Sequence, residues 1–115
     1  MADNKAKCGQ ITITYPSNCS YVCYCTPQSG CTWAVTCGDW TTGGKGLTAK
    51  PPRHASATIA GKLDGVARSL QKTWKRRVIV PANLRRRTIR RRTFRGTPAQ
   101  IAQALGLKLG SRPGR

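Results

Sequence analysis

The first 40 residues alternate between apolar and polar positions with the period of β-strands that bury one face. The segments 11–15, 19–25 and 31–37 carry this alternation or are rich in β-branched and aromatic residues. Pro16-Ser17-Asn18 and Thr26-Pro27-Gln28-Ser29-Gly30 separate them, and both are typical of turns. The pattern predicts a three-stranded antiparallel meander.

The two turns also predict which residues face one another. A hairpin closed at 26–30 places Cys25 opposite Cys31 and Cys19 opposite Cys37, while a hairpin closed at 16–18 places Tyr15 opposite Cys19. All these residues are odd-numbered, so we expect a buried odd face and a mostly polar, exposed even face. We expect the odd face to pack on the second half of the chain, against its apolar residues Leu63, Val66, Leu70 and Trp74.

All six cysteines precede residue 44, and five of them fall on the predicted odd face. Three roles fit this placement: apolar core residues, disulfides and zinc ligands. Disulfides are proposed for the facing pairs Cys25–Cys31 and Cys19–Cys37, which leaves Cys8 and Cys23 unassigned. The segment has no Cys-x-x-Cys pair and no His, so neither a metal site nor a cofactor is predicted.

The second half of the chain has the periodicity of helices as well as strands. A short strand is expected at 56–60, and apolar residues then recur with helical spacing from Leu63 to Trp74. Arg77-Val78-Ile79-Val80-Pro81 suits a short buried strand. Thr97-Pro98-Ala99-Gln100 begins a second helix with a capping box, and Gly106 ends that helix.

These elements predict an α+β fold: a three-stranded antiparallel Cys-bearing meander followed by a small basic βαββα-like unit. The boundaries are 1–40 for the meander, 41–55 for a Gly/Pro linker, 56–110 for the basic unit and 111–115 for a disordered tail. With 115 residues, the parts are expected to form one compact domain.

Residues 56–109 resemble a known family in the order of their elements. A helix, a Val-Ile-Val-Pro strand, an Arg/Thr/Ile strand and then Gly-Thr-Pro-Ala-Gln-Ile-Ala-Gln-Ala-Leu resemble the short N-terminal domain of secretins and TonB-dependent receptors. The resemblance implies a βαββα fold that docks other proteins in the periplasm. The chain departs from the family's pattern at Ile89 and Phe94, which have opposite parity and are separated by arginines.

Charge separates the two halves. The chain has 21 Lys and Arg against three Asp and no Glu, and its net charge of +18 lies entirely in residues 45–115. Seven arginines fall within 85–95, a segment we call the arginine ribbon. As a strand, the ribbon sends Arg85, Arg87, Arg91 and Arg95 to one face and Arg86, Arg90 and Arg92 to the other. Burying an unpaired guanidinium costs several kcal/mol, so we expect an edge strand or an exposed ribbon.

Guanidinium groups bind phosphate bidentately and stack on bases, which favours a nucleic acid as partner. The sequence predicts non-enzymatic binding of nucleic-acid phosphates through a set of basic residues: Arg85, Arg86, Arg87, Arg90, Arg91, Arg92, Arg95, Lys75, Arg76 and Arg77. Another polyanion or an anionic membrane surface is a further possible partner. The alternative function is a protein-docking or assembly module, in which an acidic or larger partner covers the ribbon and its edge.

Other functions find little support in the sequence. One His and no paired carboxylates give little acid–base chemistry, so no enzyme is predicted. No run of 18 apolar residues predicts a membrane span. No signal peptide is visible, so a cytoplasmic location is expected, with export as the alternative if the cysteines form disulfides.

Overall fold

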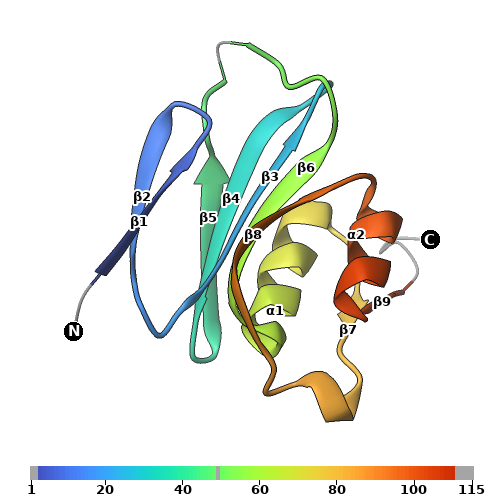
Figure 1. Ribbon diagram of the computed structural model, residues 1–115. Coiled ribbons are helices and arrows are strands. Elements are labelled where there is room, and N and C mark those ends of the chain that lie inside the picture. The colour runs from blue at the N-terminus through green and yellow to red at the C-terminus, as the bar shows by residue number, and fades with distance from the viewer. Residues whose placement is uncertain (1–2, 49, 111–115) are drawn as a thin grey trace.

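The computed structural model describes residues 3–48 and 50–110. Within these residues, nine strands, two α-helices and one 3-10 helix follow one another: β1 (Asp3–Cys8), β2 (Ile11–Pro16), β3 (Ser20–Thr26), β4 (Gly30–Cys37), β5 (Trp40–Lys45), β6 (Ser56–Lys62), α1 (Leu63–Trp74), β7 (Val78–Ile79), η1 (Ala82–Leu84), β8 (Thr88–Arg95), α2 (Pro98–Leu105) and β9 (Lys108–Leu109) (Figure 1). The tail expected at 111–115 lies outside the described residues.

The predicted α+β fold, a meander followed by a basic βαββα-like unit, is wrong, because the fold is rich in β-structure. Strands account for 49% and helices for 21% of the structure, and five strands form one antiparallel sheet in the order β5-β4-β3-β6-β8. Strand β6 of the basic half pairs with β3 of the cysteine-bearing half, and Val22 lies opposite Ile59. The two halves of the chain therefore build a single sheet.

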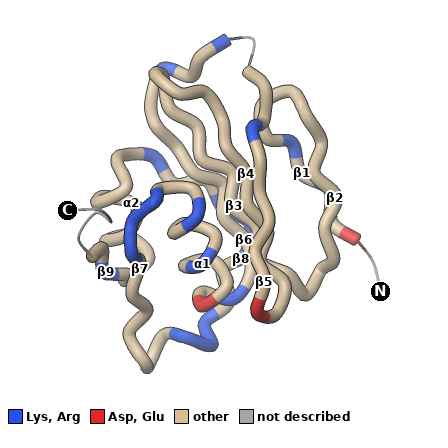
Figure 2. Tube along the Cα trace, turned by 180° about the vertical axis from the view of Figure 1, so that it is seen from behind, with Lys and Arg blue, Asp and Glu red and all other residues tan. Residues whose placement is uncertain are grey.

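The molecule has three layers (Figure 1). The β1–β2 hairpin, which is a separate two-stranded sheet, lies on one side of the five-stranded sheet, and α1 and α2 lie on the other side. Figure 2 shows the same layers from behind, in reversed order. Each interface between layers has its own apolar core, so both faces of the sheet are buried.

The predicted register is correct for one hairpin and wrong for the other. Strands β3 and β4 pair as expected, with Tyr21 opposite Val35 and Cys25 opposite Cys31. Strand β2 pairs with β1, which was not predicted, and not with β3. The Tyr15 ring instead stacks on the Tyr21 ring, with 5.0 Å between ring centroids, so the hairpin packs face to face on the sheet.

The even face of β3 and β4, expected to be exposed, is buried under the helices. Val22 and Ala34 are fully buried there, and Ile59 and Ala57 of β6 extend the apolar surface. The expectation that α1 packs on the odd face is therefore wrong. Helix α1 begins directly after β6 and packs its apolar residues on the even face, in the cluster that contains Val22 and Ile59.

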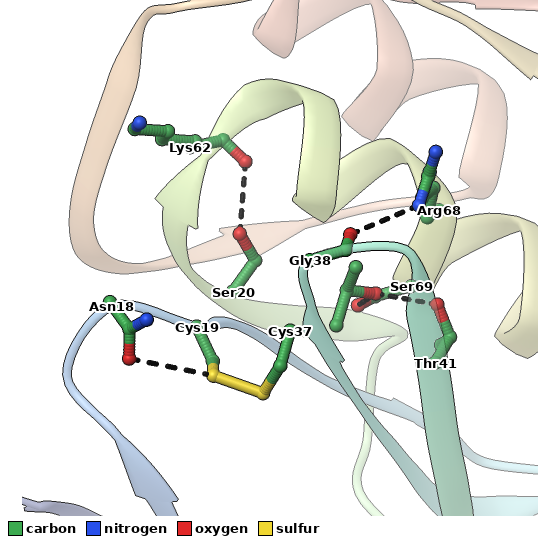
Figure 3. Close-up of a disulfide and its surroundings, with 10 residues drawn as sticks. Asn18, Cys19, Ser20, Cys37, Gly38, Thr41, Lys62, Arg68 and Ser69 are labelled. Atoms are coloured by element: carbon green, nitrogen blue, oxygen red, sulfur yellow. Dashed lines mark hydrogen bonds between the residues drawn. A yellow bond between two sulfur atoms is a disulfide. The ribbon is translucent and has the colours of Figure 1, made fainter.

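Polar residues of the even face are satisfied by hydrogen bonds. The Thr36 hydroxyl lies 2.8 Å from the Ser69 hydroxyl of α1 and 2.9 Å from that of Thr41. The Ser20 hydroxyl donates to the Lys62 carbonyl oxygen at 3.1 Å, beside the Cys19–Cys37 disulfide (Figure 3). These bonds remove the desolvation penalty that would otherwise oppose burial of this half-polar face.

The linker expected at 41–55 begins later, because Trp40–Lys45 forms β5 at one edge of the sheet. Two glycines let this strand lie close to β4. A Cβ on Gly44 would lie 3.1 Å from the Trp33 indole nitrogen, and a Cβ on Gly43 would meet the Trp33 carbonyl oxygen. Gly43 and Gly44 were expected in a flexible linker, but they belong to β5 and allow it to pack closely on β4.

Three disulfides link the cysteines: Cys8–Cys23, Cys19–Cys37 and Cys25–Cys31. The two pairs proposed from register are among them, and the two unassigned cysteines form the third. The three pairs favour an oxidising or exported location over the expected cytoplasm. Neither α-helix of the described residues is long and apolar enough to cross a membrane.

The buried even face predicts a large stability effect at Ile59. This side chain is fully buried on β6, between β3 and the edge strand β8, and packs in the helix-side core. We expect Ile59→Ala to lower the free energy of unfolding by about 2–5 kcal/mol, through lost apolar contact and the cavity left behind. The measurement is urea unfolding of the oxidised protein. Leu47→Ala, at a side chain that is 65% exposed, should change stability by less than about 0.5 kcal/mol. Equal losses in the two variants would contradict the three-layer arrangement.

Candidate functional site

The arginine ribbon lies at the edge of the sheet, as its charge predicted. Strand β8 ends the strand order and pairs with β6 on one side. All seven ribbon arginines are exposed. The strand begins at Thr88, however, so Arg85–Arg87 lie in the turn after η1, and the alternation expected from Arg85 onward is wrong.

A β-bulge explains how this strand can hold both Ile89 and Phe94 against the core. Ile59 pairs with Arg92 but Gly61 pairs with Ile89, so β8 carries one extra residue in this interval. An extra residue reverses the alternation of side chains beyond it. Ile89 and Phe94 therefore both pack against the helix-side core despite their opposite parity. Arginines fill the stretch between them.

The bulge also distributes the arginines to both faces of the edge. The Arg92 guanidinium lies over the Phe94 ring, 5.1 Å from its centroid, on the helix side. Arg91 reaches the other side, where its Nη1 donates to the Lys5 carbonyl oxygen of β1 at 3.0 Å. The edge therefore presents cations toward the helix layer and toward the hairpin layer.

Arg91 lines a hollow of about 600 Å³ between the hairpin and the sheet, together with Asp3, Lys5 and Tyr15. Burial raises the pKa of Tyr21, which stacks beneath Tyr15, to about 12, and the nearby Arg91 charge partly offsets this rise. Both phenols are therefore neutral at neutral pH, since burial raises the pKa of Tyr15 as well. Of the cations that line this hollow, Arg91 belongs to the set that the sequence predicted to bind phosphates.

The other predicted cations, Lys75, Arg76 and Arg77, follow the end of α1. Arg76 donates to the Gly110 carbonyl oxygen at 3.2 Å, so it helps to hold the chain beyond β9. Arg77 and Arg85, which are separated in sequence, line one hollow of about 290 Å³ together with Arg68 of α1. Asp64 lines the same hollow and reduces its positive charge.

The structure thus distributes the ten predicted cations over two surfaces and a turn. The edge surface comprises Arg90, Arg91, Arg92 and Arg95 on β8. The helix surface comprises Lys75, Arg76 and Arg77, which follow α1, and Arg85 of the turn lines one of its hollows together with Arg77. Arg86 and Arg87 lie in the turn between them, at the start of β8. No single hollow among the described residues collects all ten.

Sequence reasoning missed Arg53, and two further cations, on α1, also contribute to these surfaces. Arg53 lines a hollow with Arg95 and His54 and so extends the edge surface beyond the end of β8. Arg68 and Lys72, four residues apart on the outer face of α1, line a hollow next to the helix surface. The helical spacing of Arg68 and Lys72 was a usable signal, whereas the position of Arg53 depends on strand pairing.

The hydrogen bond from Arg91 to β1 predicts a local effect of mutation. We expect Arg91→Gln to speed backbone amide exchange in β1 by about 2- to 10-fold, the factor for losing a hydrogen bond worth about 0.5–1.5 kcal/mol. Arg90→Gln, on the neighbouring residue of the same strand, removes the same charge and should leave that exchange unchanged. Hydrogen–deuterium exchange followed by NMR measures both variants. Equal acceleration in both would show that charge, and not this bond, holds β1 to the edge.

Comparisons with known proteins assign neither a family nor a function to this chain. No protein-family model matches the chain, and neither a curated protein nor a solved structure matches it. The function must therefore be argued from the chain's own residues, above all from the exposed arginines of β8 and the turn before it.

Proposed function

We propose that this chain is a non-enzymatic protein that binds nucleic-acid phosphates through the edge surface and the adjoining Arg85–Arg87 turn. The observation that carries the proposal is a large excess of exposed cations over carboxylates. Three Asp can neutralise at most three of the 21 Lys and Arg, and all seven ribbon arginines are exposed. Such a row of cations attracts a polyanion and releases its condensed counterions.

The choice of arginine supports phosphate as the ligand. A guanidinium offers a planar set of donors that matches two phosphate oxygens, and it remains charged at any physiological pH. The four arginines of the edge surface lie within six consecutive residues of one strand and point to both of its faces, so a phosphate backbone that runs along the edge can meet several of them. A solubilising surface would be served equally well by lysine or by mixed charges.

Binding through this surface would be largely independent of base sequence. Phe94 is the aromatic residue of β8, and it is half-buried against the core beneath Arg92, so it is not free to stack on bases. A strand edge that carries arginines reaches phosphates more readily than base edges. We therefore expect affinity to depend strongly on salt and weakly on sequence.

The test removes equal charge from three places. One variant carries Arg85→Gln, Arg86→Gln and Arg87→Gln, a second carries Arg90→Gln, Arg92→Gln and Arg95→Gln, and the control carries Lys7→Gln, Lys45→Gln and Lys50→Gln. All nine side chains are exposed, so the substitutions should not unfold the protein. Binding to a fluorescent oligonucleotide is measured by anisotropy at several salt concentrations.

For wild type, log K should fall linearly with log salt concentration. Each arginine variant should reduce the magnitude of that slope by about 2–3, since every lost phosphate contact removes about 0.7–0.9. The control should keep the wild-type slope. Salt-independent affinity, or equal losses in all three variants, would contradict the proposed site.

The second candidate function is protein docking, favoured by the open edge of β8. One side of this strand has no neighbour among the described strands, so a partner strand could pair with it. Nuclease treatment of complexes purified with the chain separates the candidates. Loss of the bound material after nuclease treatment supports nucleic-acid binding. A protein complex that survives the treatment, and that the Arg90→Pro variant does not form, supports docking.

A further inference from the structure

Two of the three disulfides, Cys8–Cys23 and Cys25–Cys31, lie side by side. The Sγ atoms of Cys23 and Cys25 are 3.8 Å apart, although each is bonded to a different partner. Cys31 places its sulfur within 4.8 Å of both. Cys8 is bonded to Cys23, so a fourth sulfur lies next to this group of three, between the hairpin and the sheet.

This spacing suits a metal ion as well as two disulfides. With Zn–S bonds of about 2.3 Å, the sulfurs of a tetrahedral zinc site lie about 3.8 Å from one another. The Cys23–Cys25 distance already has this value. The four ligands come from β1, β3 and β4, which explains why no ligand spacing was visible in the sequence.

The surroundings of the cluster keep it closed. Cys8, Cys23 and Cys31 are buried, and only Cys25 is half-buried. The loop after β5 covers it: the Gly46 amide donates to the Cys31 carbonyl oxygen at 2.8 Å. A Cβ on Gly46 would meet the Cys8 carbonyl oxygen and lie 3.1 Å from the Cys31 Cβ, so only glycine permits this approach. Closed sites with four protein ligands are typical of structural zinc.

We propose that Cys8, Cys23, Cys25 and Cys31 form a tetrathiolate zinc site when their two disulfides are reduced. Two equivalents of a dithiol reductant supply four electrons and four protons, break both S–S bonds and leave as cyclic disulfides. Zn²⁺ then binds four sulfurs and releases four protons. The metal replaces both cross-links at once, so the hairpin stays attached to the sheet in a reducing compartment as in an oxidising one.

Cys19–Cys37 provides a matched control, because it lies at the opposite end of the β3–β4 hairpin from Cys25–Cys31. The variants are Cys25→Ser with Cys31→Ser, and Cys19→Ser with Cys37→Ser. Each protein is reduced with dithiothreitol under anaerobic conditions and titrated with Zn²⁺ and, separately, Co²⁺. Native mass spectrometry gives the metal stoichiometry, and Co²⁺ absorption reports the number and geometry of thiolate ligands.

Wild type and the Cys19/Cys37 variant should each bind one metal ion and show the visible bands of tetrahedral tetrathiolate cobalt. The Cys25/Cys31 variant should lose at least about 100-fold in affinity and lack these bands, since two of four ligands are gone. If the reduced apoprotein is unfolded, Zn²⁺ should restore native NMR dispersion to the first two proteins. No metal binding by reduced wild type, or the same affinity in all three proteins, would overturn the proposal.

Discussion

The contact between the β1–β2 hairpin and the odd face of the sheet is the interaction on which the rest of the structure depends. Tyr15 stacks on Tyr21 there, and the Cys8–Cys23 bond fixes the hairpin covalently to β3. Closing a loop of 15 residues in this way stabilises a fold by about 3 kcal/mol through its effect on the unfolded chain. Without the hairpin, a row of buried cysteines and aromatic rings would face water.

With one face covered, the even face is left for the helices. The apolar residues of α1 and α2 join Val22 and Ile59 in one cluster, and the short β7–β9 pair closes it. Because both faces of the sheet are covered, the arginines of 85–95 lie at its exposed edge and in the turn before β8. Self-repulsion of a net charge of +18 opposes compaction, and three cross-links resist it in the part of the chain that carries little charge. The disulfides thus help the fold to tolerate the mutual repulsion of its arginines.

The sequence predicted the features that depend on local rules. The turn at 26–30 determines the β3–β4 register, and the capping box at Thr97 and Gln100 begins α2 where expected. Charge alone predicted an edge strand or an exposed ribbon at 85–95, because an interior strand would bury unpaired arginines, and β8 is an edge strand.

Features that depend on tertiary pairing were missed. The first strand, β1, has Ala6 and Cys8 as its only buried residues, too weak an alternation to recognise. The even face of β3 and β4 looked polar because Thr36 and Ser20 are buried only by virtue of partners on α1 and β6. The only trace of the β8 bulge in the sequence is that Ile89 and Phe94 have opposite parity. This parity departs from a family's pattern, and the bulge explains it.

The central claim is that a cross-linked sheet presents exposed arginines at one edge to a polyanion. Titrating ¹⁵N-labelled oxidised protein with a short single-stranded oligonucleotide tests it most directly. The amides of 85–95 should shift most, and those of β5, at the opposite edge of the same sheet, should hardly move. The largest shifts in β5, or no shifts at low salt, would contradict the account.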